Sequence, residues 1–173
     1  MALLDYSKAY DRTWRERLLL KLSKLGAPQQ MIRWISAFLT TRTAEVNINN
    51  TLSKPVRMKQ VLPQGSVLSP LLFLLYINDI GTDVPKEVEH LLFADDASLS
   101  ATDNDINAAN DKLQVAVSAV QQWSALNKLD LNLKKSCTFF FTTDPHQAKW
   151  RPDIKLFGEQ IKFGDGPNEN HTG

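Results

Sequence analysis

A chain of 173 residues has the length of one domain, and its single cysteine, Cys137, excludes an internal disulfide and a zinc site built from cysteines. The formal net charge of +1 gives no sign of a dedicated nucleic-acid binder, because such chains are often far more basic. No charged leader precedes an apolar stretch at the N-terminus, and the most apolar run, residues 71–77, is too short to cross a membrane. We therefore expect an intracellular protein without a signal peptide or transmembrane segment.

Periodicity and turn residues predict the elements in the first half of the chain. Leucines at helical spacing, with Asp11 as the cap and Gly26 as the stop, predict the first helix. Alternating apolar and polar residues on either side of Asn49–Asn50 predict a hairpin. The expected elements are a strand ending at Leu4, helices over residues 11–26 and 28–40, hairpin strands over residues 45–49 and 56–60, and a helix from residue 69 to about residue 80.

The second half predicts further strands and one long helix. The expected elements are strands over residues 88–94 and 97–101 around a turn at Asp95–Asp96, a helix from a cap at Asp103 to about residue 126, strands over residues 129–133 and 137–142, and a hairpin over residues 154–163 around Gly158–Glu159. Residues 164–173 are rich in Gly, Asn and Pro and are expected to be disordered. This order predicts an α+β fold, a sheet with helices packed on one face.

Asp95 and Asp96 are the first candidates for chemistry. They are adjacent carboxylates between apolar strands, and we expect their flanks, residues 91–93 and Leu99, to be buried. Like charges a few ångströms apart repel each other, and a divalent cation would relieve that repulsion. Aspartate is also a good turn residue, and for this dipeptide alone that interpretation stays open.

Two further features add polar groups. Asp5 closes an apolar strand and is a candidate third carboxylate, although a strand-end aspartate needs no such role. Hard Mg²⁺ takes oxygen ligands, and a pair of such ions activates an attacking oxygen and steadies a leaving one. In the loop before the helix near residue 69, Gly65 lets the backbone approach a ligand and Gln64 offers a donor and an acceptor. A plain loop before a helix is an equal interpretation.

Four segments combine these candidate residues in chain order: LDYSKAYD at residues 4–11, LPQGSVLSPLLF at residues 62–73 running on to YINDI at residues 76–80, FADD at residues 93–96, and LNLKKS at residues 131–136. In this order and at this spacing they resemble the palm motifs of reverse transcriptases. The long second motif most resembles retrotransposons that carry no long terminal repeats. The resemblance covers about residues 2–163. It implies a reverse transcriptase domain over residues 1–163, a palm-like antiparallel sheet with part of the fingers, truncated at both ends.

The same resemblance assigns roles residue by residue. It implies that Asp5, Asp95 and Asp96 are catalytic and bind two Mg²⁺ ions, with Mn²⁺ as the alternative ion. The backbone carbonyl of Tyr6 would be a further metal ligand. Tyr10 falls at the family's aromatic steric gate, where the ring would exclude a ribose 2′-OH, while packing at the start of the helix stays open for this residue.

The remaining assignments concern the nucleotide and the surface. Gln64 and Gly65 would line the incoming dNTP and the template. Lys135 would lie near the triphosphate as an acid for pyrophosphate; Lys134 is an equal candidate by chemistry, and a solvated surface lysine is the other interpretation. Asp11 and Asp79 are expected to cap helices. A solvated helix face is expected for the basic residues Arg12, Arg15, Arg17 and Lys21, with a template track as the alternative interpretation.

The implied activity is RNA-directed DNA polymerisation, with nucleotidyl transfer from a dNTP to a primer 3′-OH on an RNA/DNA template–primer. The alternative is a catalytically inactive remnant that binds nucleic acid or protein; sheets bind RNA by stacking bases on exposed aromatics, and no exposed aromatic pair is expected here. Because the family's fingers, thumb and endonuclease segments would lie elsewhere in a parent polyprotein, we expect the chain not to polymerise on its own.

Overall fold

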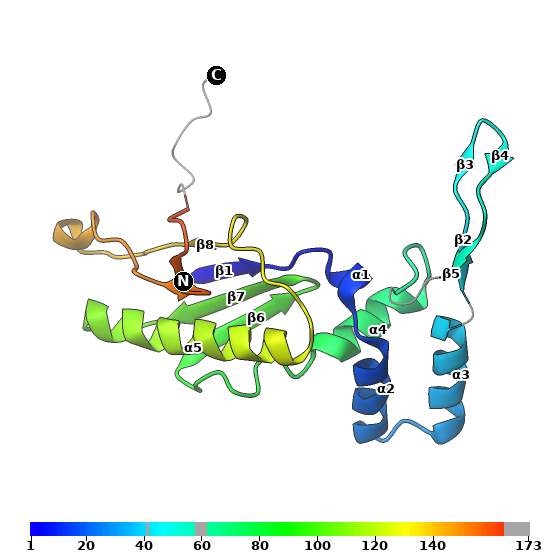
Figure 1. Ribbon diagram of the computed structural model, residues 1–173. Helices are drawn as coiled ribbons and strands as arrows, with labels where there is room; N and C mark the ends of the chain where they lie inside the picture. The colour runs from blue at the N-terminus through cyan, green and yellow to red at the C-terminus, as the bar shows by residue number, and fades with distance from the viewer. Residues whose placement is uncertain (41, 58–61, 165–173) are drawn as a thin grey trace. The chain divides into compact units, whose positions relative to one another are not determined.

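The computed structural model describes residues 1–40, 42–57 and 62–164 (Figure 1). The chain forms two compact units, each described separately below: a sheet unit, Met1–Ser7 with Ile80–Gly173, and a helical unit, Lys8–Asp79. The limits of the predicted domain, residues 1–163, stay a prediction. Residues 165–173 of the predicted tail and residues 58–60 of the predicted second hairpin strand lie outside the described residues.

An antiparallel four-stranded sheet is the centre of the sheet unit, with strand order β6-β7-β1-β8 (Figure 1). Its strands are β1 (Ala2–Asp5), β6 (Val88–Phe93), β7 (Asp96–Ala101) and β8 (Cys137–Thr138). The other elements are α5 (Ile106–Leu126), the short 3-10 helix η1 (Pro145–Gln147), and a hairpin of β9 (Lys155–Leu156) with β10 (Glu159–Gln160). The predicted α+β fold, an antiparallel sheet with helical cover on one face, is confirmed.

Helix α5 covers one face of the sheet, the face to which Leu4 and Leu99 point. Leu4 and Leu99 are each 1 % exposed there, because side chains alternate across a strand and the strand register puts these two on the face on which α5 packs against β7. The residues between them point the other way, and Leu3 and Leu91 are 36 % and 71 % exposed. We call this second side the open face. It carries Leu3, Asp5, Leu91, Phe93, Asp96, Ser98 and Cys137.

Several element ends differ from the prediction in the sheet unit. Helix α5 begins at Ile106, so its cap is Asp105, whose carboxylate accepts from the Asn107 N–H at 3.0 Å. The predicted cap, Asp103, pairs instead with Lys112. The predicted strands after α5 reduce to two-residue β8 and an isolated bridge between Tyr6 and Leu131. The last hairpin is confirmed, although its turn lies one residue earlier than predicted, at residues 157–158, where both φ angles are positive.

The helical unit contains four helices and a two-part hairpin in its described residues. These are α1 (Ala9–Arg12), α2 (Arg15–Lys24), α3 (Gln29–Thr40), α4 (Leu68–Ile77), and strands β2 (Thr43–Ala44) with β5 (Val56–Arg57) and β3 (Asn47–Ile48) with β4 (Thr51–Leu52). The predicted turn is confirmed, with positive φ at both Asn49 and Asn50. The prediction of a single helix over residues 11–26 is wrong at its start, because the structure has two helices there, α1 and α2. The Thr13 hydroxyl donates to the Ala9 carbonyl where α1 ends, and Asp11 lies inside α1 rather than capping a helix.

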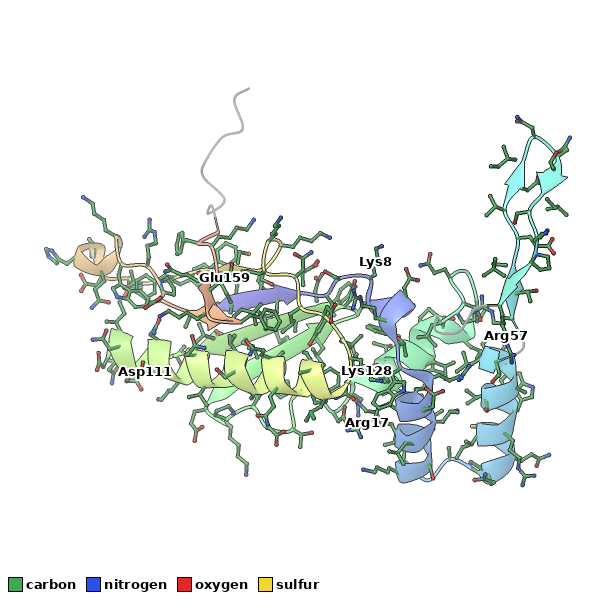
Figure 2. All side chains as sticks on the ribbon, viewed as in Figure 1. Lys8, Arg17, Arg57, Asp111, Lys128 and Glu159 are labelled. Carbon is green, nitrogen blue, oxygen red and sulfur yellow. The ribbon has the colours of Figure 1, made fainter. Side chains whose placement is uncertain are left out.

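A buried lysine connects α2 to the end of α4. Lys21 is 7 % exposed, and its ammonium donates to the Tyr76 carbonyl at 2.6 Å and to Asp79 Oδ1 at 2.5 Å. Burial lowers the pKa of Lys21, while the bond to Asp79 raises it. The predictions of a solvated Lys21 and a capping Asp79 are therefore wrong, because a cation taken out of water needs such partners. Other charges are spread over many elements, as Arg17, Asp111 and Glu159 illustrate (Figure 2).

Candidate active site

Two carboxylates oppose each other across neighbouring strands of the open face. Asp5 at the end of β1 is the register partner of Asp96 at the start of β7. The Asp5 N–H donates to Ser136 Oγ at 3.2 Å and its carbonyl accepts from the Asn132 N–H at 2.8 Å, so both backbone groups face away from β7. The Asp5–Asp96 pair is therefore of the non-hydrogen-bonded kind, in which Cα atoms lie about 4.5 Å apart and the side chains are closest.

The environment of Asp5 disfavours its charge. Its side chain is 24 % exposed, and Oδ1 is buried without a hydrogen-bond partner. Burial raises the pKa of Asp5; Lys135 opposes this, and the negative charges of Asp96 and Asp95 add to it. Like charges directly opposite each other destabilise a sheet, and a buried carboxylate oxygen without a partner is costly. The sequence thus builds a site that lacks positive charge.

Lys135 supplies part of the missing charge. Its Nζ lies 3.8 Å from Asp5 Oδ1, while its own side chain is 67 % exposed. The loop that carries it is fixed by Asn132, whose carbonyl accepts from the backbone N–H groups of Lys135 and Ser136. Sequence reasoning left Lys134 and Lys135 equal, and the ion pair with Asp5 favours Lys135. It missed Ser136, whose only signal was its place directly after the two lysines.

The turn before Asp96 differs from the predicted one. β6 ends at Phe93 and β7 begins at Asp96, so Ala94 and Asp95 form the turn rather than Asp95 and Asp96. Ala94 has a φ of 52°, a left-handed conformation that costs free energy for a residue with a Cβ. Backbone strain of this kind gathers at functional sites.

Oxygen donors of this kind fit a divalent cation. Asp5 and Asp96 are opposed on one face, Asp95 is near enough to raise the pKa of Asp5, and Oδ1 of Asp5 is unsatisfied. Within residues 1–40, 42–57 and 62–164, however, no three acidic, histidine or cysteine side chains stand close enough to hold a metal ion as they are. The arrangement is therefore a carboxylate pair with a third carboxylate near it.

Tyr6 presents its side chain and its backbone to different partners. The ring is buried, its hydroxyl lies 2.7 Å from Ser124 Oγ on α5, and burial raises the pKa of Tyr6 to about 12. Around the Tyr6–Leu131 bridge the hydrogen bonds belong to the neighbouring residues, from Ser7 to Asp130 and from Asn132 to Asp5. The Tyr6 carbonyl consequently points away from that segment, toward the side on which β7 lies.

A partly apolar cavity lies beside the carboxylates. A cavity of about 580 Å³ on the open face is lined by Asp5, Asp96, Lys135 and by apolar residues including Leu3, Leu91 and Phe93. Leu91 and Phe93 are 71 % and 83 % exposed, so the prediction that this flank is buried is wrong, whereas Leu99 is buried as predicted. β6 is an edge strand, and these two residues point to the uncovered face.

The other predicted site residues lie in the helical unit. The Tyr10 ring stacks on Phe73 with 4.7 Å between centroids, and the Tyr10 carbonyl accepts from the Leu62 N–H. Gln64 Nε2 donates to Asp11 Oδ1 at 3.0 Å, and Gly65 has a φ of 83°, which its missing Cβ allows. The structure thus gathers Asp5, Tyr6, Asp95, Asp96 and Lys135 in one unit, and Tyr10, Gln64 and Gly65 in the other.

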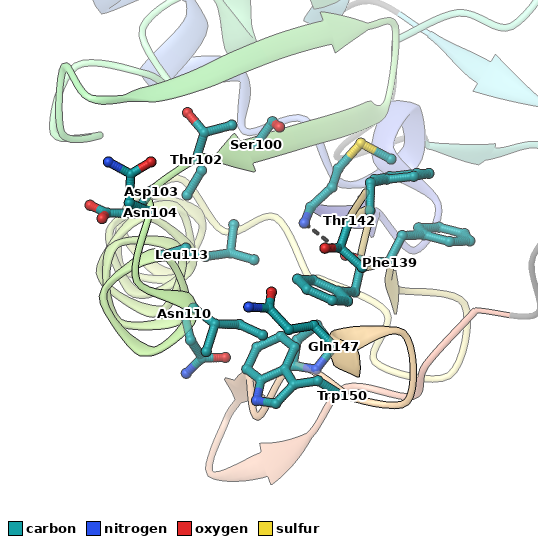
Figure 3. Close-up of a pocket in the computed structure, with 17 residues that line it drawn as sticks. Ser100, Thr102, Asp103, Asn104, Asn110, Leu113, Phe139, Thr142, Gln147 and Trp150 are labelled. Atoms are coloured by element: carbon teal, nitrogen blue, oxygen red, sulfur yellow. Dashed lines mark hydrogen bonds between the residues drawn. The ribbon is translucent and has the colours of Figure 1, made fainter. Parts of the chain in front are cut away.

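A second cavity, of about 200 Å³, lies between α5 and residues 139–150 (Figure 3). Phe140 and Trp150 meet edge to face beside it, with centroids 4.8 Å apart. Its one acidic side chain among the described residues, Asp103, already pairs with Lys112. Next to it Phe139 and Phe141 stack, and Phe141 is 72 % exposed. Phe139 itself is half-buried, so only one ring of this pair is exposed.

Comparison with known proteins agrees with the motifs. The family model described as reverse transcriptase (RNA-dependent DNA polymerase) matches residues 1–161. The RNA-directed DNA polymerase from mobile element jockey of Drosophila melanogaster is 30 % identical, over 93 % of this chain and 18 % of its own length. The probable RNA-directed DNA polymerase from transposon BS of the same species is 30 % identical, over 80 % of this chain and 16 % of its own length. The chain therefore spans less than a fifth of these relatives.

Solved structures agree on the fold. An apo telomerase from Candida Tropicalis, truncated from its C-terminal domain, matches with a TM-score of 0.61 at 16 % identity, over 78 % of this chain and 29 % of that chain. This chain belongs to the reverse transcriptase family. Within that family it is of the type found in retrotransposons without long terminal repeats. The family generally uses divalent metal ions and binds nucleic-acid templates. None of the helices in the described residues has both the length and the apolar character of a membrane span.

Proposed function

We propose that this chain is the catalytic centre of an RNA-directed DNA polymerase that extends a primer on an RNA/DNA template–primer. The observation that carries the proposal is the opposed Asp5–Asp96 pair on the open face, with an unsatisfied, buried Asp5 oxygen, in a chain of the reverse transcriptase family. Asp5, Asp95 and Asp96 bind the divalent ions, with Mg²⁺ as the expected ion and Mn²⁺ as the alternative. The Tyr6 carbonyl is the proposed additional ligand.

The reaction is nucleotidyl transfer. The primer 3′-hydroxyl loses its proton to solvent, its oxygen forms a bond to the α-phosphorus of the dNTP, the bond from that phosphorus to the β-bridging oxygen breaks, and pyrophosphate leaves. Two divalent ions held by Asp5, Asp95 and Asp96 would supply activation of the attacking oxygen and charge stabilisation of the leaving one. The chain's own residues have two roles. Asp5 and Asp96 define the cation-binding position by their strand register. The ammonium of Lys135 gives a proton to pyrophosphate. Catalysis of this kind depends mainly on positioning and electrostatics.

The helical unit supplies the proposed nucleotide contacts. Gln64 and Gly65 line the dNTP and the template; the positive φ of Gly65 and the bond that orients Gln64 support a built loop there. The Tyr10 ring, held by its stack on Phe73, excludes the ribose 2′-OH. In a protein of the relatives' length, segments outside this chain would serve as the fingers, the thumb and the endonuclease. We therefore expect the chain alone to bind metal without extending a primer.

Primer extension tests the proposal. The 173-residue chain and a version extended at both ends to the relatives' length are assayed on an RNA template with dNTPs and Mg²⁺ or Mn²⁺. Asp95→Asn in each is the blank, because it keeps the side-chain shape and removes the charge. Extension by the longer protein that disappears in the Asp95→Asn variant supports the proposal. A longer protein that binds the template–primer yet extends no better than its blank contradicts it.

Tyr10 has a separate test in the longer protein. Tyr10→Ala opens the space above the sugar and should raise ribonucleotide incorporation relative to deoxynucleotide incorporation. Tyr10→Phe keeps the ring and is the matched control. An unchanged ratio in Tyr10→Ala would mean that the stack on Phe73 is packing alone.

A second candidate function is nucleic-acid binding without copying. The 72 % exposed ring of Phe141, which stacks on the half-buried Phe139, favours it, because an exposed aromatic ring stacks on an unpaired base. It predicts that Phe141→Ala weakens RNA binding by the 173-residue chain while the longer protein shows no extension. Polymerisation by the longer protein would instead leave this surface as, at most, an accessory contact.

A further inference from the structure

The Asp5–Lys135 pair is unequal in burial and loose in geometry. The acid is 24 % exposed and the base is 67 % exposed, with 3.8 Å between Asp5 Oδ1 and Lys135 Nζ. That distance exceeds the range of a protein hydrogen bond, and Oδ1 has no other hydrogen-bond partner. The contact is therefore a charge–charge attraction at a position where a tighter ligand could still bind the oxygen.

The carboxylates need a cation, and within the described residues Lys135 is the one that acts on Asp5. Asp95 and Asp96 oppose the ionisation of Asp5, and Lys135 favours it. A single ammonium charge beside several carboxylates leaves the group net negative. A divalent ion carries twice that charge and approaches oxygen to about 2.0–2.1 Å, as Mg²⁺ does.

The lysine can leave without disturbing the site. Its backbone N–H is anchored on the Asn132 carbonyl, and Ser136 Oγ bridges that carbonyl to the Asp5 N–H. These bonds fix the loop and the strand end, and they do not involve the Lys135 side chain. The four-carbon stem can therefore rotate away while the carboxylates keep their geometry.

We propose that the Lys135 ammonium occupies the cation position of the Asp5–Asp96 pair in the metal-free protein and is displaced by the divalent ion. The inference rests on the proposed metal-binding role of these carboxylates. Lys135 would then be a positioning residue before the ion binds, and its release would free the ammonium for the phosphates of the incoming nucleotide. The Lys135 side chain would therefore pair with the carboxylates before the ion binds and with the phosphates afterwards.

The test is a Mn²⁺ titration of the full 173-residue chain. Electron paramagnetic resonance measures the concentration of free Mn²⁺ at each step, which gives the affinity. Lys135→Met removes the charge and keeps most of the stem, and Lys134→Met makes the same change one residue away. Removing a competing charge at this distance should tighten Mn²⁺ binding about threefold to tenfold in Lys135→Met. Lys134→Met should stay within about twofold of the wild type, because solvent screens a charge without a contact.

Asp5→Asn separates the inference from the proposed function. In an Asp5→Asn background Lys135→Met should no longer tighten binding, because the pair is already broken. If Asp5→Asn weakens Mn²⁺ binding but Lys135→Met leaves affinity unchanged or lower, the displacement is overturned and the metal site stands. If Asp5→Asn binds Mn²⁺ like the wild type, the proposed metal site fails and the displacement with it. Lys135→Gln, with circular dichroism as the folding check, replaces Lys135→Met if that variant does not fold.

Discussion

The molecule contains two lysine–aspartate pairs built in opposite ways. In the helical unit the cation is buried: Lys21 has a side chain 8 % exposed, and its partner Asp79 is 47 % exposed at 2.5 Å. In the sheet unit the anion is the buried member: Asp5 is 24 % exposed, and Lys135 is 67 % exposed at 3.8 Å. The first pair is closed by a further bond to the Tyr76 carbonyl, whereas the second leaves Asp5 Oδ1 unsatisfied.

The difference separates a structural pair from a functional one. The buried ammonium of Lys21 donates to two oxygens and lies over the Tyr76 ring, so it joins α2 to the end of α4. A half-buried carboxylate with an unsatisfied oxygen, which lies near other carboxylates and an exposed lysine, favours the binding of a cation. The chemistry of the residues is the same in both pairs, and burial decides which of them can bind an ion.

The largest stability effect should come from the buried lysine. Lys21→Met leaves the Tyr76 carbonyl without its buried partner and should lower the free energy of unfolding by about 1–3 kcal/mol. The same substitution at the exposed Lys135 should change it by less than about 0.5 kcal/mol. Urea unfolding followed by circular dichroism measures both. Equal losses at the two positions would remove the distinction between the pairs.

A smaller effect, opposite in sign, is expected at Asp5. The pKa of Asp5 is raised in the folded chain, so the folded state holds this proton more tightly than the unfolded state. Ionisation therefore costs stability as pH rises from the ordinary aspartate value through the raised pKa, and the full cost is present at neutral pH. In metal-free buffer Asp5→Asn should be more stable than the wild type by about 0.2–1 kcal/mol at neutral pH.

The pH dependence is the check on that prediction. Thermal unfolding of both proteins from about pH 3 to neutral pH should show a difference that is near zero below the ordinary aspartate pKa and grows as pH rises. Comparing the two proteins at each pH cancels the other titrating groups. A difference that is constant with pH, or an Asp5→Asn protein less stable at neutral pH, would mean that Lys135 already satisfies Asp5.

Local patterns predicted much of the fold. The sheet strands around Asp95 and Asp96, the long helix α5 and the turn at Asn49–Asn50 follow from alternation, helical spacing and turn chemistry, which act over a few residues. The break after Arg12 was missed because a single hydroxyl, that of Thr13, competes for the Ala9 carbonyl. The buried state of Lys21 was missed because its partners are more than 50 residues away in the chain.

In the candidate site too, local patterns identified the residues, whereas contacts between distant segments could not be predicted. The motifs named Asp5 and Asp96, but only the strand register places them opposite each other, because pairing depends on two distant segments. The preference for Lys135 over Lys134 depends on which way a loop directs two identical side chains. The exposure of Leu91 and Phe93 could not be predicted either, since their apolar sequence is what a buried strand also has.

Primer extension by two variants, each altered at the aspartate of one lysine–aspartate pair, tests the central claim most directly. Asp5→Asn and Asp79→Asn each replace the acid of a lysine pair by its amide, in the protein extended to the relatives' length. If the Asp5–Asp96 pair is the catalytic centre, Asp5→Asn should lower the extension rate by at least about 100-fold, which corresponds to about 2.7 kcal/mol on the barrier. Asp79→Asn should stay within a few-fold of the wild type. Equal rates in the two variants, with the wild type active, would contradict the assignment of the open face as the active site.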